Sequence, residues 1–219
     1  MPRLLFEKTG NAIWISHLDL MRLFQRAFKR AKLPLTHTQG FNPRPSVSIA
    51  LPLSVGVESK CELLDFALTV DEISCNEIKE RLNSTLVEGI KVLDVYEDGR
   101  KVRDLSLLDC NILFSYDDGV PACAIDQISD LFSKDSVFVP KKTKNGIQDQ
   151  NIVTMIHDFQ IEQAGEKALT IRTLIACQNP TLNPAQIVFA IGKYLPELEP
   201  SNTFIGRLEV FDINKTIFR

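Results

Sequence analysis

Apolar residues recur at every third or fourth position over residues 17–32, the spacing of a helix that buries one side. The members of this stripe are Leu20, Leu23, Phe24, Ala27, Phe28 and Ala31. Ser16, followed three residues later by Asp19, has the form of an N-terminal capping box with Asp in place of Glu. Because the residue before a proline avoids helical angles, Pro34 should end the helix at about Lys32. The pattern predicts an amphipathic helix here.

The rest of the first hundred residues predicts strands and one further helix. Short apolar stretches at 4–6 and 12–15 surround a turn at Gly10 and predict an interrupted strand or a tight hairpin. A helix is expected to start at Ser74 and to end near Gly89. Strands are expected at about 46–52, 60–70 and 90–97. The resulting order, β-α-β-β-α-β, is typical of a ferredoxin-like sandwich.

The second half repeats this order more weakly. Its expected strands are 107–116, 137–139, 151–162, 167–177 and 206–211, and its expected helices are 122–132 and 184–193. Residues 141–145 predict a polar basic loop, and residues 98–104 predict a linker. We therefore predict an α+β chain of two ferredoxin-like halves in tandem, residues 1–98 and residues 105–219. No residue-level similarity relates the halves, so this prediction rests on element order alone.

Charge is distributed unevenly along the chain. The net charge of −3, from 25 basic and 28 acidic residues, by itself disfavours a polyanion ligand. Residues 1–60, however, carry 9 basic and 3 acidic residues, residues 61–135 carry 7 and 17, and residues 136–219 carry 9 and 8. The positive excess coincides with the first predicted helix, so the total charge does not exclude a nucleic-acid ligand there.

The five cysteines are widely spaced, odd in number and without a C-x-x-C pair: Cys61, Cys75, Cys110, Cys123 and Cys177. This spacing disfavours a disulfide framework or a zinc or iron–sulfur site, and it predicts small buried apolar side chains. No apolar run approaches the ~20 residues that span a bilayer. The N-terminus is charged where a signal peptide is apolar, which favours a cytoplasmic protein.

Four basic residues share one side of the first predicted helix, at positions i, i+4, i+7 and i+8: Arg22, Arg26, Lys29 and Arg30. Such clusters bind phosphate backbones because each cation displaces condensed counterions. The following loop, residues 35–45, is stiffened by Pro43 and Pro45 and adds Arg44.

The same loop carries groups suited to bases. Phe41 is placed to stack on an unpaired base, and the amides of Gln39 and Asn42 are able to read base edges. We therefore predict an RNA-binding surface formed by this loop and the basic side of the helix. The alternative interpretation is a solvated helix face with Phe41 packed in the core.

His17 is the strongest candidate for catalysis. It stands at a helix start, where backbone N–H groups favour anions. If Ser16, His17, His37, Gln39 and Asn42 converge at one end of the sheet, they provide the parts for metal-free RNA cleavage, with His17 as general acid or base. A capping or hydrogen-bonded structural role is the alternative. No metal site is predicted, because the spacing of His17 and His37 matches no helical ligand pair.

Glu58, Glu62 and Asp65 form an acidic set on a predicted strand. Glu58 and Glu62 share a face, and Asp65 points to the other face unless a bulge intervenes. Paired carboxylates could bind a cation or act as acid and base. We expect them instead to pair with the arginines of the first helix.

The order of motifs in the first 70 residues resembles a bacterial family called radical SAM-linked protein (domain of unknown function 2344). The matching motifs are Ser16 to Arg22 (SHLDLMR), Leu33-Pro34, Gln39 to Pro43 (QGFNP), and Gly56, Glu58, Ser59, Glu62 and Asp65. The resemblance covers the second half of the chain more loosely. The family often has His after the QGFNP motif, where this chain has Arg44, which weakens a catalytic or metal role there.

This resemblance implies a context rather than an activity. Family members lie next to, or are fused behind, a radical SAM protein that looks cobalamin-binding, and near genes of RNA processing. An iron–sulfur cluster, S-adenosylmethionine and cobalamin are therefore expected on a partner, because this chain lacks the three clustered cysteines that a cluster requires. We expect an RNA-recognition or substrate-delivery protein in rRNA or tRNA modification. The alternatives are an RNA-cleaving or RNA-modifying enzyme using His17, and a structural adaptor.

Overall fold

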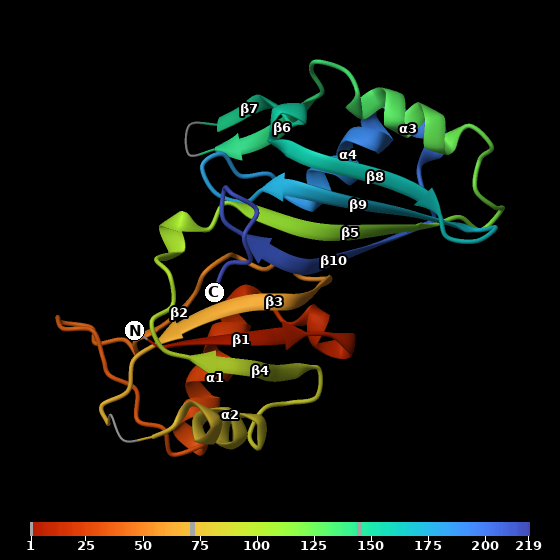
Figure 1. Ribbon diagram of the computed structural model, residues 1–219. Helices are drawn as coiled ribbons and strands as arrows, with labels where there is room; N and C mark the ends of the chain where they lie inside the picture. Colours follow the sequence, from red (N-terminus) through yellow and green to blue (C-terminus); the bar gives the residue numbers. More distant parts are fainter. Residues whose placement is uncertain (1, 71–72, 144–145) are drawn as a thin grey trace. The chain divides into compact units, whose positions relative to one another are not determined.

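The computed structural model describes residues 2–70, 73–143 and 146–219 of the chain. The chain forms two compact units (Figure 1). The N-terminal unit extends to Asp104 and also contains Phe218 and Arg219, and the C-terminal unit runs from Leu105 to Ile217. The sequence predicts that the whole of 105–219 forms the second domain. The last two residues instead lie within the N-terminal unit.

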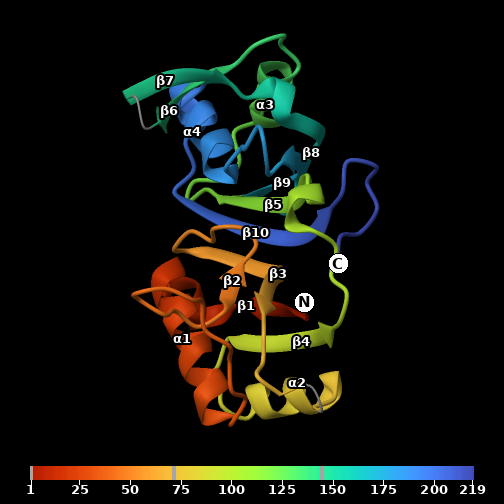
Figure 2. The same cartoon turned by 90° about the vertical axis from the view of Figure 1, so that its left-hand side faces the viewer.

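The N-terminal unit is an antiparallel sheet with two helices on one face (Figure 2). Its elements are β1 (Arg3–Lys8), η1 (Gly10–Trp14), α1 (His17–Arg30), β2 (Val47–Ile49), β3 (Val57–Phe66), α2 (Cys75–Asn83), β4 (Ile90–Tyr96) and η2 (Val102–Asp104). Within this unit the strand order is β4-β1-β3-β2, because β2 pairs with the edge of β3 that faces away from β1. Each helix therefore connects two strands that have a third strand between them.

Aromatic contacts hold α1 against this sheet. Phe24 meets Phe6 of β1 edge-on at a centroid distance of 4.7 Å, and Phe28 packs on Phe66 of β3 at 5.0 Å. Full burial of such a side chain contributes about 1.5–3 kcal/mol. The Ser16 hydroxyl accepts the Asp19 N–H at 3.2 Å, which confirms the predicted helix start.

The strand expected at 12–15 is wrong, because this segment is the 3₁₀ helix η1. Short apolar stretches do not distinguish a strand from a single buried turn. The carbonyl of Ile13 accepts the Gly56 N–H at 2.9 Å and the ammonium of the fully buried Lys8 at 2.9 Å. Tertiary hydrogen bonds therefore fix the conformation of this turn.

The C-terminal unit repeats the arrangement of an antiparallel sheet with two helices, α3 and α4, on one face (Figure 2). Its elements are β5 (Leu107–Ser115), α3 (Ala124–Phe132), β6 (Phe138–Thr143), β7 (Gly146–Asn151), η3 (Val153–Met155), β8 (Ile156–Gln163), β9 (Ala168–Ala176), α4 (Pro184–Tyr194), η4 (Pro196–Leu198) and β10 (Asn202–Phe211). Within this unit the strand order is β10-β5-β9-β8. Asn183 and Gln186 form a capping box with Pro184 in the first turn, which confirms the predicted start of α4.

The loop expected at 141–145 is instead part of a hairpin. β6 and β7 pair from Phe138 opposite Asn151 onward, as a separate two-stranded sheet. Lys144 and Asn145 lie outside the described residues. Residues 146–149 are all exposed, so this strand has no buried face and no alternation of polar and apolar residues that would have revealed it.

The cysteines fall into two groups. Cys61, Cys110 and Cys177 are buried, as predicted, and burial raises the pKa of the Cys110 and Cys177 thiols to about 12. Cys75 is partly exposed, and Cys123 is exposed, so the prediction of burial was wrong for Cys123. No helix in the described part of the chain is long and apolar enough to cross a membrane.

Candidate nucleic-acid interface

The basic side of α1 faces solvent because its apolar side packs against the sheet. Leu20, Phe24, Ala27 and Phe28 are buried, and the helical repeat therefore turns four cations outward. These are Arg22, Arg26, Lys29 and Arg30, and all four are exposed. The predicted basic surface is thus accessible to a ligand.

The four cations are not equally available. Arg22 forms an ion pair with Asp19 at 3.0 Å, and both side chains are more than half exposed, so the pair is worth little. A hydrogen bond from the Ser16 hydroxyl, together with Arg22, holds the pKa of the Asp19 carboxyl below its usual range. Arg30 donates to the carbonyl of Thr85 at 2.8 Å. Among the described residues, no ion pair involves Arg26 or Lys29.

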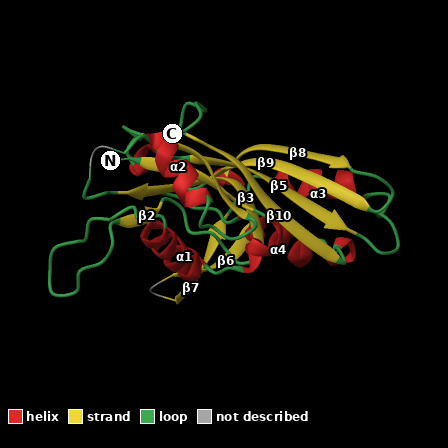
Figure 3. Ribbon diagram, turned by 90° about the horizontal axis from the view of Figure 1, so that it is seen from below, coloured by secondary structure: helices red, strands yellow, loops and turns green. Residues whose placement is uncertain are grey.

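The loop between α1 and β2 extends away from both elements (Figure 3). Its base is closed by backbone hydrogen bonds from Thr38 to Arg44 and from Ser46 to Thr36, both at 2.8 Å. The Thr38 hydroxyl also accepts the Arg44 N–H at 3.0 Å. These contacts make the base of the loop a defined structure from which residues 39–43 project.

Phe41 is fully exposed at the end of this loop. The alternative of a core position for Phe41 is therefore wrong. Gln39, Asn42 and Arg44 are exposed beside it, and Gly40 has a φ of +138°, a value that favours glycine. The loop thus presents an aromatic ring, two amides and one guanidinium to solvent, the groups that recognise unpaired bases and phosphates.

His17 and His37 do not converge at one end of the sheet, although the alternative of RNA cleavage requires it. His17 begins α1 beside the start of β3, where Gly56 is hydrogen-bonded to Ile13. His37 lies beyond the other end of β3. Its neighbour Thr36 donates its backbone N–H to the carbonyl of Ala67, the residue that follows β3. The ten residues of β3 span roughly 30 Å. The connection through α1 places the two histidines at opposite ends of the sheet.

His17 is partly buried at the first position of α1. Its Nδ1 atom is buried and has no hydrogen-bond partner in the part of the chain that the structure describes. Without His37, Gln39 or Asn42 nearby, the group of residues that the alternative of RNA cleavage requires is not assembled.

The three acidic candidates lie in three different environments. Asp65 forms a two-point ion pair with Arg3 of β1, at 2.6 and 3.2 Å, instead of pairing with the arginines of α1. Glu62 is buried and accepts the Ser59 hydroxyl at 2.8 Å. An extra residue in β3, opposite the segment from Phe6 to Lys8, moves Glu58 to the face opposite Glu62, where it is exposed. The three carboxylates therefore form no cluster.

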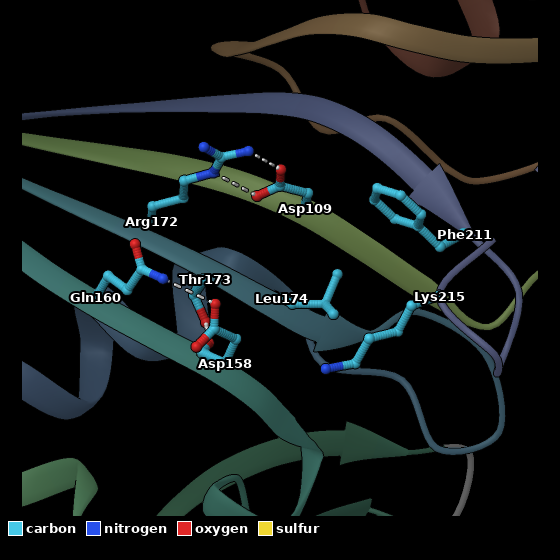
Figure 4. Close-up of a pocket in the computed structure, with 8 residues that line it drawn as sticks. All are labelled: Asp109, Asp158, Gln160, Arg172, Thr173, Leu174, Phe211 and Lys215. Atoms are coloured by element: carbon cyan, nitrogen blue, oxygen red, sulfur yellow. Dashed lines mark hydrogen bonds and ion pairs between the residues drawn. The ribbon is translucent and has the colours of Figure 1, made fainter. Parts of the chain in front are cut away.

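Across residues 2–70, 73–143 and 146–219, no three His, Cys, Asp or Glu side chains are grouped so as to hold a metal ion. The C-terminal unit has a cavity of about 360 Å³ on its sheet (Figure 4). Arg172 in this cavity pairs with Asp109 at 2.7 Å, and Asp158 and Lys215 also line it. Its charges balance, so it offers no excess of positive charge to a polyanion.

Sequence analysis missed an exposed aromatic residue beside the basic helix, Trp14. It lies at the end of η1, directly before α1, and is 67% exposed. A strand at residues 12–15 gives no reason to join this side chain to the basic surface, whereas the observed turn does. Its position next to the SHLDLMR motif was the available signal.

Comparisons with known proteins place the chain in a family. A profile of the family described as "Uncharacterized protein conserved in bacteria (DUF2344)" matches residues 2–184. The chain therefore belongs to this family. No protein of curated function matches it significantly.

Solved structures resemble nearly the whole of this chain at low similarity, and three of them illustrate this. A Cbf5-Nop10-Gar1 complex covers 95% of this chain at 10% identity and a TM-score of 0.49. An archaeal box H/ACA sRNP Nop10-Cbf5 complex covers 94% at 9% identity and a TM-score of 0.46. An unknown protein from Galdieria sulphuraria covers 94%, and 96% of its own chain is covered, at 10% identity and a TM-score of 0.27. The present chain spans 48% and 46% of the first two chains, about half their length.

Proposed function

We propose that this protein recognises RNA through the basic side of α1 and the loop of residues 36–45. The observation that carries the proposal is Phe41, a large aromatic side chain fully exposed on a loop whose base is held by hydrogen bonds. A solvent-exposed ring has no packing role in its own unit. Beside exposed cations it has the chemistry of a stacking residue.

The two parts of this interface have different tasks. The cations of α1 contact phosphates and supply affinity that depends on salt but not on sequence. Phe41 stacks on an unpaired base, an interaction worth about 1–3 kcal/mol. Gln39 and Asn42 contact base edges, and Arg44 adds a further phosphate contact. We assign the protein to recognition or delivery of ribosomal or transfer RNA for modification.

The fold is suited to this task. We infer that both units are ferredoxin-like sandwiches, because β4-β1-β3-β2 and β10-β5-β9-β8 are the same permutation of four strands, with the helices in matching places. In this interpretation the β6–β7 hairpin is an insertion between the first helix and the second strand of the C-terminal repeat. The fold by itself does not specify RNA, so the proposal depends on the residues of the interface.

The radical chemistry that the family resemblance implies would belong to another chain. We propose a separate radical SAM enzyme as the partner, carrying the iron–sulfur cluster, S-adenosylmethionine and cobalamin. The five cysteines here support this division of tasks, because they are dispersed and three of them are buried. The acidic region 61–135 is the candidate docking surface.

The triple variant Arg22→Glu/Arg26→Glu/Lys29→Glu tests the RNA interface. Arg30 is spared because it contacts Thr85. We expect the affinity for bacterial rRNA or tRNA to fall about a hundredfold at moderate salt. The slope of log affinity against log salt should fall by about two, roughly 0.7 for each lost contact to a single strand. Fluorescence anisotropy with labelled RNA at several salt concentrations measures both values.

The matched control reverses three exposed lysines elsewhere in the same unit, Lys60, Lys91 and Lys101. It changes the net charge by the same amount and should retain most of the affinity. An equal loss in both variants, or wild-type binding that does not respond to salt, would contradict the proposed interface.

The partner is tested by co-expression with the radical SAM protein and size-exclusion chromatography after nuclease treatment. We expect co-elution without RNA, because the proposed docking surface is separate from the RNA interface. Reversal of exposed acidic residues at Glu80, Glu88 and Glu97 should abolish co-elution, whereas the α1 triple variant should preserve it. Separate elution of the two wild-type proteins would refute the partnership.

A further inference from the structure

Trp14 is an exposed aromatic residue in a fixed position. It ends η1 and is 67% exposed. The backbone before it is held because the carbonyl of Ile13 accepts hydrogen bonds from Gly56 and Lys8. The ring lies next to Gly56, because a Cβ there would be 3.5 Å from Trp14 Cζ3. One edge of the indole is thus supported by backbone while most of the ring faces solvent.

The surroundings of Trp14 lead directly to the basic side of α1. Leu18 is 67% exposed, and Val55, the neighbour of Gly56, is 53% exposed. Leu18 and Arg22 are one helical turn apart on the same side of α1, and Arg26 follows after another turn. The exposed surface therefore passes from apolar groups at the N-terminus of α1 to cations along its length.

The second exposed aromatic, Phe41, belongs to the other end of this helix. α1 has 14 residues and is about 21 Å long, and the loop that carries Phe41 follows its C-terminus. The exposed aromatic residues of this interface thus flank a row of cations. This arrangement matches an extended strand of nucleic acid, whose phosphates follow the cations while unstacked bases meet the rings.

We propose that Trp14 is a second base-stacking residue and that the surface binds single-stranded RNA. This inference rests on the proposed function and adds its substrate class. In a duplex the bases are paired and stacked on one another, so their faces are not accessible to Trp14 and Phe41. Leu18 and Val55 form the apolar border of the base site.

Trp14 is the only tryptophan of the chain, so intrinsic fluorescence reports on this position alone. We titrate the full-length protein with oligouridine of about eight nucleotides, within the ~4–16 nucleotides typical of such sites. The emission of Trp14 should be quenched, with the same midpoint as the anisotropy of a labelled oligonucleotide. A duplex of equal length should bind more weakly and leave the emission unchanged.

Trp14→Ala should weaken binding of the oligonucleotide about ten- to hundredfold by anisotropy. Trp14→Phe, which keeps a stacking ring and guards against a folding defect, should retain most of the affinity. The matched control is Phe189→Ala, because Phe189 is a half-exposed aromatic on α4 of the other unit. This variant should bind as the wild type does.

The outcomes separate this inference from the proposed function. RNA binding could depend on salt while the emission of Trp14 is not quenched and Trp14→Ala binds RNA as the wild type does. This result would overturn the role of Trp14 and leave the basic interface in place. Equal quenching by the duplex would overturn the single-strand assignment. Absence of any RNA binding by the wild type would overturn the proposed function itself. A Trp14 response to a protein partner but not to RNA would assign this patch to protein docking and overturn the inference.

Discussion

Asp65→Ala is expected to lower the free energy of unfolding of the N-terminal unit by about 3–5 kcal/mol. The side chain of Arg3 is only 3% exposed, and Asp65 neutralises it through two hydrogen bonds, at 2.6 and 3.2 Å. Removal of the carboxylate leaves a buried guanidinium without its counter-charge. Gly99 also packs closely on this guanidinium, because a Cβ there would lie 3.0 Å from Arg3 Cζ.

Urea unfolding followed by Trp14 fluorescence measures this effect, because the only tryptophan lies in the N-terminal unit. This local probe is needed because a chain of two units need not unfold in one step. The matched control is Glu58→Ala, an exposed carboxylate on the same strand, which should change stability by less than about 0.5 kcal/mol. A loss below 1 kcal/mol for Asp65→Ala would show that solvent screens the pair.

This prediction also decides the role of Asp65. Sequence analysis grouped it with two other carboxylates as a possible cation site or acid–base pair. If Asp65 serves only the ion pair with Arg3, the Asp65→Ala variant should bind RNA as the wild type does when it is kept folded at low temperature. Loss of RNA affinity in the folded variant would give Asp65 a place in the interface.

Phe218→Ala is expected to destabilise the N-terminal unit by about 3–5 kcal/mol, although the residue lies one position from the C-terminus of the chain. Phe218 is fully buried, and two guanidinium groups lie over its ring. Arg3 Cζ is 5.4 Å from the ring centroid, and Arg100 Cζ is 5.1 Å from it. The substitution removes both cation–π contacts and leaves a cavity next to the Arg3–Asp65 pair.

The adjacent residue provides the control for this variant. Ile217 is 52% exposed, so Ile217→Ala should shift the unfolding midpoint little. The decisive readout is again the Trp14 transition, because Phe218 belongs to the N-terminal unit and not to the unit that precedes it in sequence. A normal Trp14 transition in Phe218→Ala would mean that the ring contributes nothing to this unit.

The two large effects should not be additive. Asp65 and Phe218 both act on Arg3, so the double variant should lose less stability than the sum of the single variants. Once Asp65 is gone, the Arg3 side chain no longer has a fixed position from which to contact the ring. Additive losses would indicate that the two residues stabilise the unit independently.

The parts of this structure that were predictable from sequence are those in which local and tertiary preferences agree. The helix that begins after Ser16 has a capping residue, an apolar stripe and a proline beyond its end, and each of these is a short-range signal. The start of α4 at Pro184 has the same character. The exposed cations of α1 follow from the same periodicity, because a buried stripe determines which side of a helix faces solvent.

Errors occurred where the local pattern was short or polar. A few apolar residues fit both a strand and the turn of η1, and Lys8 and Gly56 decide its conformation from distant positions. The exposed β7 strand carries no alternation. The acidic set was placed on faces by the period of a regular strand, and one extra residue in β3 changed the face of Glu58.

By itself, the sequence determined the basic helix, its outward side and the positive excess of the first 60 residues, because these depend on spacing and on local charge. Only the tertiary structure decided which residues are neighbours. It separated His17 from His37 by the length of β3, paired Asp65 with Arg3, brought Phe218 to the first strand and left Trp14 and Phe41 exposed. Such contacts join residues up to 215 positions apart, and no local pattern encodes a partner at that distance.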